Sequence, residues 1–231
     1  MNSMATLYIV ATPIGNLEDI SLRALRILKE SKAVLCEDTR ITRKLLAHYG
    51  LNTSTISYHQ HSGRLKVDKI ISLLKEGHDL ALVTDAGTPG ISDPGGRLIE
   101  LVRQELGLAV TVQSVPGPSA LTAAVSLAGD GFDRFLFLGF LPHKKGRQTI
   151  LKEIATSHYP VVLYESKHRI VKLLDELISL VAGGSRPLEI IVAREISKLH
   201  ESLYLGNPQK VREELQLDPV SLKGEFVVLI K

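Results

Sequence analysis

The residues best suited to chemistry in this 231-residue sequence lie in a glycine- and proline-rich segment, LALVTDAGTPGISDPGG, at positions 80–96. An apolar run leads directly into it, and Asp85, Thr88, Ser92 and Asp93 supply polar groups that suit a ribose or an amino acid portion of a ligand. Glycine lets the backbone approach a ligand closely, and proline stiffens the loop. The segment is neither a P-loop nor a GxGxxG dinucleotide fingerprint. We expect a small-molecule site here; the alternative is a tight strand–helix connection that Asp93 caps.

Two further polar loops follow apolar runs earlier in the chain. The first is TPIGNL at 12–17, and the second, CEDTR, carries Glu37 and Asp38 beside Arg40. Two adjacent carboxylates near Arg40 and Arg43 could orient a substrate or hold a general base. The alternative is a charged loop in which Asp38 caps the following helix. Since loops at the carboxyl ends of parallel strands share one edge of the sheet, we expect these loops to converge with the glycine-rich segment.

Basic residues gather in three strings of the second half: HKKGR at 143–147, YESKHR at 164–169 and REISKLHE at 194–201. Together they could form a phosphate-binding rim. The alternative is a set of solvated surface ion pairs, which contribute little energy.

Metal and disulfide chemistry is not indicated. Cys36 is the single cysteine, so it can form neither an intramolecular disulfide nor a cysteine cluster, and a reducing compartment is expected. The eight histidines follow no metal-binding pattern. His59 and His61 could bind a metal, although a polar loop is favoured, so we expect no metal.

The composition is that of a globular protein, with 44% hydrophobic and 23% charged residues. Lys and Arg exceed Asp and Glu by 28 − 25 = 3, which permits an anionic partner without requiring one. No run approaches the ~18 apolar residues of a membrane span. The apolar run Leu7–Ala11 is too short for the core of a signal peptide. We therefore expect a soluble, cytoplasmic protein with no membrane partner.

Short apolar runs alternate with helical patterns through the first half. Strands are expected at 6–11, 33–36, 55–58, 79–84 and 110–115, and helices from 21, at 42–49, 62–77 and 96–105. Strands that alternate with helices predict crossover units and a mostly parallel sheet.

Pro116–Gly117–Pro118 interrupts both helix and sheet, so we predict a domain of residues 1–116 and a second of 117–231. The PGPSA loop there could present a helix N-terminus to a carboxylate or hydroxyl, or it could be a plain joint that Ser119 caps. Further on, helices are expected at 119–128, after 147 and at 170–181, and strands at 134–140, 160–165, 188–194, 202–205 and 225–230. The last strands follow one another without a predicted helix, which favours antiparallel pairing and a mixed second sheet.

A series of motifs resembles one family over nearly the whole chain. The motifs, in order, are TPIGNLEDIS, CEDTR, TDAGTPGISDPG, PGPSA, FLGFLP, YESKHR and REISKLHE. They resemble the ribosomal RNA small-subunit methyltransferase I family, in the tetrapyrrole-methylase class of S-adenosylmethionine-dependent methyltransferases. The resemblance implies two α/β domains with the methyl donor in a cleft between them, and a homodimer.

The resemblance also implies the activity and the site. The activity would be methylation of the 2′-hydroxyl of a cytidine in the decoding region of 16S rRNA, on the assembled or assembling small subunit. The donor, S-adenosylmethionine, would contact Pro13, Asp85, Gly87, Thr88, Pro89, Ile91, Ser92, Ser119, Ala120, Leu141, Tyr164 and Gly224. The loops at Asn16 and at 37–43, together with the basic rim, would face the RNA. Many members of the family continue beyond the KGEFV-like strand, whereas this sequence ends at Lys231, so RNA would be held by the core or with help from the subunit itself.

The expected chemistry is an in-line displacement in which the protein aligns the 2′-oxygen with the methyl carbon. We expect Glu37 or Asp38 to act as the base, and Arg40 and Lys198 to hold the flanking phosphates. Two other functions stay open at this point. One is methylation of a small substrate such as a tetrapyrrole, and the other is a non-catalytic module that binds the donor or nucleotides.

Overall fold

The computed structural model describes residues 4–59 and 62–231, and it divides into two units, Met1–Ser119 and Ala120–Lys231. Our predicted boundary at residue 116 falls just before the end of the first unit. His61, considered above as a metal ligand, lies outside the described residues. None of the helices described is both long and apolar enough to cross a membrane.

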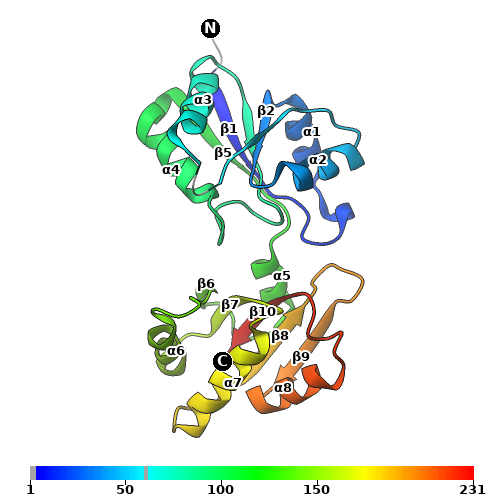
Figure 1. The fold of residues 1–231 in the computed structure, drawn as a ribbon, viewed down its shortest axis with the longest axis vertical. Helices are drawn as coiled ribbons and strands as arrows, with labels where there is room; N and C mark the ends of the chain where they lie inside the picture. The colour runs from blue at the N-terminus through cyan, green and yellow to red at the C-terminus, as the bar shows by residue number, and fades with distance from the viewer. Residues whose placement is uncertain (1–3, 60–61) are drawn as a thin grey trace. The chain divides into compact units, whose positions relative to one another are not determined.

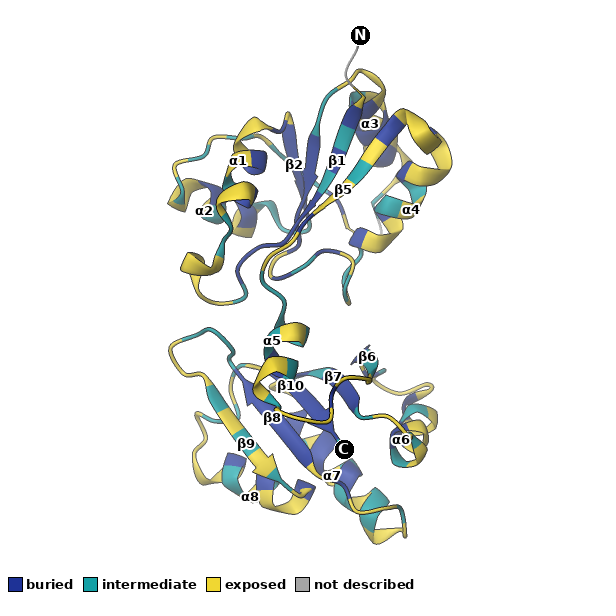
Figure 2. Cartoon of the chain, turned by 180° about the vertical axis from the view of Figure 1, so that it is seen from behind, coloured by how far each residue is buried: buried dark blue, intermediate teal, exposed yellow. Residues whose placement is uncertain are grey.

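The first unit is built on a parallel five-stranded sheet in the order β3-β2-β4-β1-β5. Its strands are β1 (Ala5–Val10), β2 (Ala33–Cys36), β3 (Thr55–Ser57), β4 (Leu80–Leu82) and β5 (Val110–Val115). Strand β2 is buried along its whole length, whereas the edge strand β5 exposes several residues (Figure 2). The predicted parallel sheet is therefore confirmed.

Helices cover both faces of this sheet (Figure 1). They are α1 (Leu22–Glu30), α2 (Thr39–His48), α3 (Arg64–Lys75) and α4 (Gly95–Leu106), with short 3-10 turns at Leu17–Asp19 and Gly107–Ala109. Helices α1 and α2 pack on one face, and α3 and α4 on the other. The Ser21 hydroxyl accepts a hydrogen bond from the Ala24 amide at 3.0 Å, so α1 begins at its predicted cap.

The strand order gives β4 a special position. The chain leaves β1 and β2 toward the face of α1 and α2, but it leaves β4, which lies between them, toward the face of α4. Open α/β sheets bind ligands in the crevice where neighbouring connections diverge in this way. The glycine-rich segment is the connection that leaves β4 at this point.

The second unit has a mixed five-stranded sheet in the order β6-β7-β10-β8-β9. Its strands are β6 (Leu136–Phe140), β7 (Val161–Ser166), β8 (Ile190–Arg194), β9 (Ser202–Gly206) and β10 (Glu225–Ile230). Strands β6 and β7 pair in parallel, and the remaining pairs are antiparallel, as the sequence predicted.

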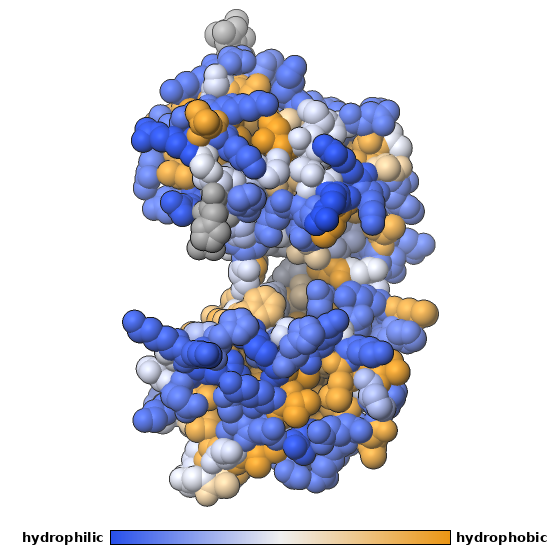
Figure 3. Space-filling view, in the orientation of Figure 1, coloured by the Kyte–Doolittle hydropathy of each residue, from blue (hydrophilic) through white to orange (hydrophobic). Residues whose placement is uncertain are grey.

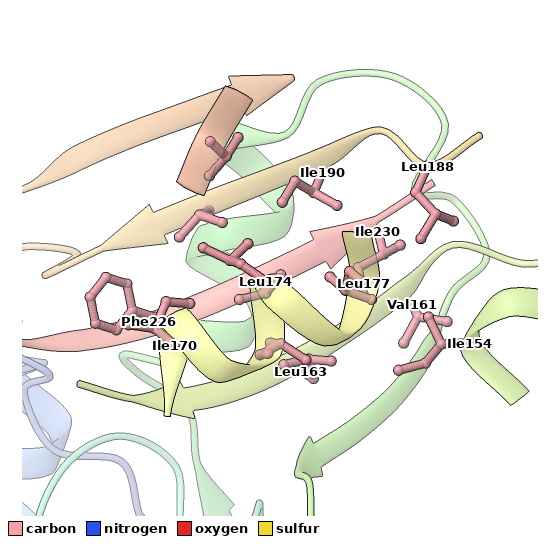
Figure 4. Packing of buried hydrophobic residues seen from close by; sticks show 14 of the residues in the cluster. Ile154, Val161, Leu163, Ile170, Leu174, Leu177, Leu188, Ile190, Phe226 and Ile230 are labelled. Carbon is pink, nitrogen blue, oxygen red and sulfur yellow. The ribbon is translucent and has the colours of Figure 1, made fainter. Parts of the chain in front are cut away.

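The helices of the second unit are α5 (Ala120–Leu127), α6 (Arg147–Thr156), α7 (Ile170–Ala182) and α8 (Pro208–Leu217). Helices α6, α7 and α8 pack on one face of the sheet, where α7 presents Ile170, Leu174 and Leu177 to the strands (Figure 4). Helix α5 packs on the other face.

The sequence analysis missed α8 and was wrong to place β9 and β10 in succession without a helix. The helix begins after Asn207, whose side chain accepts from the Lys210 amide at 2.8 Å, and Pro208 occupies its first turn. Val211 and Leu215, four residues apart, are fully buried. An Asn-Pro start followed by this spacing is the signal that could have revealed it.

Candidate functional site

Four loops meet at the carboxyl edge of the sheet in the first unit: the three that were predicted to converge, and the loop after β5, which was not included in that prediction. Thr12 and Gly87 exchange backbone hydrogen bonds of 2.9 and 3.0 Å, which join the loops after β1 and β4. The Asp38 amide donates to Asp85 Oδ1 at 3.3 Å, and the Thr88 hydroxyl donates to the Pro118 carbonyl at 3.0 Å. The glycine-rich loop is therefore bonded to the loops that follow β1, β2 and β5.

Asp93 stabilises the glycine-rich loop through hydrogen bonds within the loop. Its carboxylate accepts from the Gly90 amide at 2.9 Å and from the Gly95 amide at 2.7 Å. Ser92 has a φ of 63°, which is uncommon for a residue with a side chain. The alternative, a tight strand–helix connection with Asp93 as its cap, holds only in part, because the Asp93 carboxylate accepts from the Gly95 amide at the start of α4 but the N-cap residue is Pro94. It does not account for the bonds between this loop and its three neighbours.

The backbone conformation at position 87 requires glycine. Its φ is 84°, and a Cβ there would lie 3.4 Å from Ile14 Cγ2. Gly87 is buried, and its amide and carbonyl are both bonded to Thr12, so glycine is needed here for the positive φ that joins the two loops.

Glu37 is the unusual carboxylate of this edge. Its Oε1 atom is buried and has no hydrogen-bond partner among the described residues. Burial raises the pKa of Glu37 above its ordinary value, and the charges of Asp85 and Asp93 raise it further. Burial also raises the pKa of Asp85, although the hydrogen bond from the Asp38 amide opposes this shift. Among the described residues of the first unit, no cation lies within salt-bridge distance of Glu37 or Asp85. The negative charge of this edge is therefore not neutralised by an ion pair.

Asp38, the neighbour of Glu37, is in the opposite situation. It is the N-cap of α2, where it accepts from the Arg40 amide at 2.8 Å, and it pairs with the Arg40 guanidinium at 2.6 Å. The side-chain hydrogen bond from Arg40 is the main reason that the pKa of Asp38 is lowered to about 2. Asp38 therefore caps α2, as the alternative reading of CEDTR predicted.

The donor set of this edge suits S-adenosylmethionine. A sulfonium cation favours a site with uncompensated carboxylates, and ribose hydroxyls and an ammonium group donate to carboxylate oxygens such as those of Glu37 and Asp85. Pro13 and Pro89 are buried, Ile91 and Ser119 are half-buried, and Ser92 is exposed.

Four residues of the second unit were assigned to the donor on the resemblance. Ala120 begins α5, and Leu141 is buried, with its carbonyl accepting from Arg169 at 2.7 Å. The ring of Tyr164 packs against Phe137 and Phe140 at centroid distances of 5.1 and 5.5 Å, and burial raises its pKa.

Gly224, the fourth of these residues, lies against a strained turn. Its φ is 109°, and a Cβ there would come within 2.5 Å of Glu195 Cγ. Glu195 and Ser197 themselves have φ values of 52° and 68°. Such strain in non-glycine residues clusters at functional sites.

Lys198 is held in this turn by two carboxylates. Its ammonium donates to Glu195 at 2.8 Å and to Glu225 at 2.9 Å. Desolvation by itself would lower the pKa of Lys198, but these two hydrogen bonds outweigh it and raise that pKa. Lys198 is therefore a cation whose charge is already paired. It belongs to the second unit, whereas Glu37 belongs to the first.

The predicted basic rim is wrong for its three arginines, of which Arg169 is paired with the buried Glu165. Arg147 is buried and pairs with Glu176 at 2.6 Å, and Arg194 is buried with its guanidinium bonded to the carbonyls of His200, Val220 and Lys223. Burial with full hydrogen bonding leaves neither side chain for a phosphate. The exposed cations of the rim are Lys144, Lys145 and Lys167.

Arg147 belongs to a buried network that sequence reasoning missed. Glu165, fully buried, pairs with Arg169 at 2.8 Å and lies 3.9 Å from Arg147. Both arginines also donate to backbone carbonyls of the turn after β6, at Leu141 and Pro142. Glu165 lies in β7 and Arg169 in the turn before α7, so the spacing of the two residues along the chain gave no signal of their pairing. In the described residues, no group of three or more His, Cys, Asp or Glu side chains could hold a metal ion.

Comparison with known proteins agrees with this architecture. The family model described as Tetrapyrrole (Corrin/Porphyrin) Methylases matches residues 6–211. Ribosomal RNA small subunit methyltransferase I of Pseudomonas aeruginosa is 42% identical over 99% of this chain and 79% of its own length. The protein of the same name from Thermotoga maritima is 42% identical over 98% of both chains.

Solved structures with low sequence identity share the fold. Cobalt precorrin-4 methyltransferase, a cobalamin biosynthetic enzyme, aligns with a TM-score of 0.71 at 18% identity, over 100% of this chain and 96% of its own. Uroporphyrin III C-methyl transferase from Thermus thermophilus aligns with a TM-score of 0.64 at 19% identity, over 97% of each chain.

Proposed function

Because the chain belongs to the ribosomal RNA small subunit methyltransferase I family, within the tetrapyrrole methylases, we propose that it methylates 16S rRNA of the small ribosomal subunit. The acceptor would be the 2′-hydroxyl of a cytidine in the decoding region, and the donor S-adenosylmethionine. The observation that carries the proposal is the match at 42% identity, over 98–99% of this chain, to two proteins of that name, since the solved neighbours below 25% identity support the fold alone.

S-adenosylmethionine, when bound, supplies a methyl group activated by its sulfonium charge. In the first unit, the Asp85 carboxylate would hold it, together with Pro13, Gly87, Thr88, Pro89, Ile91, Ser92 and Ser119. In the second unit, Ala120, Leu141, Tyr164 and Gly224 would contribute. Negative charge from Asp85 would favour the cationic donor over the uncharged thioether that remains after transfer.

Glu37 is the better of the two candidate bases, and we assign it the role of accepting the 2′-hydroxyl proton. Its Oε1 is unpartnered, and its raised pKa makes it a stronger base than an ordinary carboxylate. Asp38 has a pKa of about 2 and is already bonded to Arg40, so it would accept a proton poorly. Asp38 instead positions α2 and the Arg40 side chain.

Arg40 could hold a flanking phosphate, because its side chain is 85% exposed and its partner Asp38 is close to solvent. Lys198 could do so only by exchanging Glu195 or Glu225 for the phosphate. We therefore propose Arg40 as the stronger phosphate ligand of the two.

The test is transfer of labelled methyl groups from S-adenosylmethionine to three separate acceptors. These are small subunits that lack the modification, naked 16S rRNA and uroporphyrinogen, with donor binding measured independently by calorimetry. We expect label in 2′-O-methylcytidine from the subunits. Label in the tetrapyrrole, or donor binding with transfer to none of the three, would replace the proposal by a small-molecule methyltransferase or a donor-binding module.

The proposal includes a homodimer, which the family resemblance implies, and a cytoplasmic location, since the substrate is part of the ribosome. Sedimentation measures the first directly. A monomer at micromolar protein concentration would contradict it.

A further inference from the structure

Helix α2 differs in charge from the other helices that the structure describes. Its sequence, TRITRKLLAH, contains Arg40, Arg43 and Lys44 and no acidic residue. Each of the other described α-helices that carries charged residues mixes both signs. With a net charge of only +3 over the whole sequence, three unmixed cations on one helix are a local concentration.

The three cations share the solvent face of α2. Residues three and four apart are neighbours on a helix, so Arg40, Arg43 and Lys44 lie together, and all three are exposed. The opposite face carries Thr42 and Leu46, which are buried against the sheet. Hydrophilic side chains gather over the region of α2 in the space-filling view (Figure 3).

This arrangement is not explained by the stability of the helix. A cation in the first turn of a helix is disfavoured by the positive end of the helix dipole, and Arg40 lies there. Asp38 offsets that charge through its salt bridge. Arg43 and Lys44 form no salt bridge with any described residue. Arg43 Nε donates a hydrogen bond to the Thr55 hydroxyl at 3.2 Å.

The face begins beside the proposed base. Glu37 and Asp38 directly precede α2, and the helix rises by 1.5 Å per residue, so Lys44 lies roughly 6 Å further along the axis than Arg40. A row of cations therefore leads away from the carboxylate edge. Its chemistry suits a chain of phosphates that continues from a nucleotide placed at Glu37.

We propose that Arg43 and Lys44, on the exposed face of α2, bind the phosphate backbone of RNA beside the nucleotide that is methylated. This inference rests on the proposed function and adds a binding surface to it. Phosphate contacts position the substrate and leave its chemistry unchanged. The surface would therefore govern affinity for RNA, and neither donor binding nor the rate at saturation.

The test compares two double variants that each remove two positive charges from the first unit. The first is Arg43→Gln with Lys44→Gln. The control is Lys75→Gln with Arg103→Gln, exposed cations in the last turns of α3 and α4, at the opposite edge of the sheet. The readouts are KM for small subunits, kcat, donor Kd and the dependence of RNA affinity on salt.

We expect KM to rise about tenfold in the first variant, with kcat and donor Kd unchanged. The slope of log affinity against log salt should fall by about 1.4, since each lost contact with a single-stranded phosphate contributes ~0.7. The single variant Arg43→Lys keeps the charge and should leave KM close to that of the parent. Thermal melting confirms that each variant is folded.

Equal effects of the two double variants, or an unchanged salt slope in the first, would overturn the inference. Loss of kcat in the first variant at unchanged salt slope would also overturn it. Failure of the proposed function is distinguishable, because the parent protein itself would then transfer no methyl group to rRNA.

Discussion

Adjacent carboxylates at residues 37 and 38 have opposite electrostatic environments. Glu37 is partly buried with an unpartnered oxygen, whereas Asp38 is bonded to a guanidinium and to a helix amide. The first environment disfavours the charged form and the second favours it. One carboxylate is therefore suited to accept a proton and the other to hold a helix in place.

The first prediction concerns Glu37→Gln, with Asp38→Asn as its comparison. Glu37→Gln should lower kcat at least ~10-fold, because the amide cannot accept the hydroxyl proton. Asp38→Asn should lower kcat less, since asparagine also caps helices. Methyl transfer at saturating donor and RNA measures both. Equal losses, or a loss below tenfold for Glu37→Gln, would remove Glu37 from the role of base.

The pH dependence follows from the direction of the Glu37 shift. A proton acceptor works only when ionised, so activity should rise with pH through the raised pKa of Glu37, and this limb should vanish in Glu37→Gln. The free energy of unfolding depends on pH in the opposite direction to the activity. A carboxyl with a raised folded-state pKa contributes stability below its unfolded pKa that is lost as the pH rises through the folded pKa.

At neutral pH, Glu37→Gln should therefore unfold at a denaturant concentration no lower than the parent does. This outcome would show that the loss of activity in Glu37→Gln comes from the missing proton acceptor and not from unfolding of the protein. A clearly lower midpoint would mean that Glu37 contributes a stabilising contact and that the activity loss is structural.

At the scale of elements, buried ion pairs join α6, β7 and α7 to the turn after β6. Arg147 is the hub, because it pairs with Glu176, approaches Glu165 and donates to the Pro142 carbonyl. Removing one member of a buried pair leaves the other charge unpaired in a medium that solvates it poorly. The cost is accordingly much larger than for an ion pair on the surface.

Arg147→Met should destabilise the protein by about 3–5 kcal/mol. The control is Arg26→Gln, which breaks the exposed pair with Glu30 and should cost less than about 1 kcal/mol. Urea unfolding at equilibrium measures both. Similar shifts of the two midpoints would show that the network carries no more stability than a surface pair.

Much of the fold and the convergence of the loops could be predicted from sequence, because the spacing of apolar residues and the positions of glycine and proline are local signals. Strands Ala33–Cys36 and Val110–Val115 match the prediction residue for residue. The roles of Arg147 and Arg194 could not be predicted, since burial of a long cationic side chain depends on partners up to 29 residues away in the chain. The choice between Glu37 and Asp38 likewise depends on the burial of Glu37 and on the charges of Asp85 and Asp93, which come from another loop.

At the scale of the whole molecule, each unit has its own hydrophobic core. In the first unit, Leu7 and Leu80 lie in one cluster and Leu28 in a second, on opposite faces of one sheet. In the second unit, the largest cluster contains Leu163 and Leu174. None of these clusters includes residues of both units.

Leu174→Ala should therefore destabilise the second unit selectively, by about 2–5 kcal/mol, because it removes a fully buried side chain from that core. Hydrogen exchange should quicken in β7, β8 and β10 and remain close to that of the parent in β1 and β4. A uniform increase across both units would show instead that the chain unfolds as one cooperative body.

The contact between Gly224 and Glu195 restricts the order in which mutations can accumulate. A side chain at position 224 would overlap Glu195, whose carboxylate accepts from the Glu225 amide at 2.9 Å and from Lys198 at 2.8 Å. The φ of 109° at Gly224 disfavours a side chain even where there is space, and the overlap requires in addition that a shorter residue arise at 195 first, a step that leaves Lys198 with one carboxylate. Among descendants of this sequence, positions 195, 198 and 224 should change together or stay as they are.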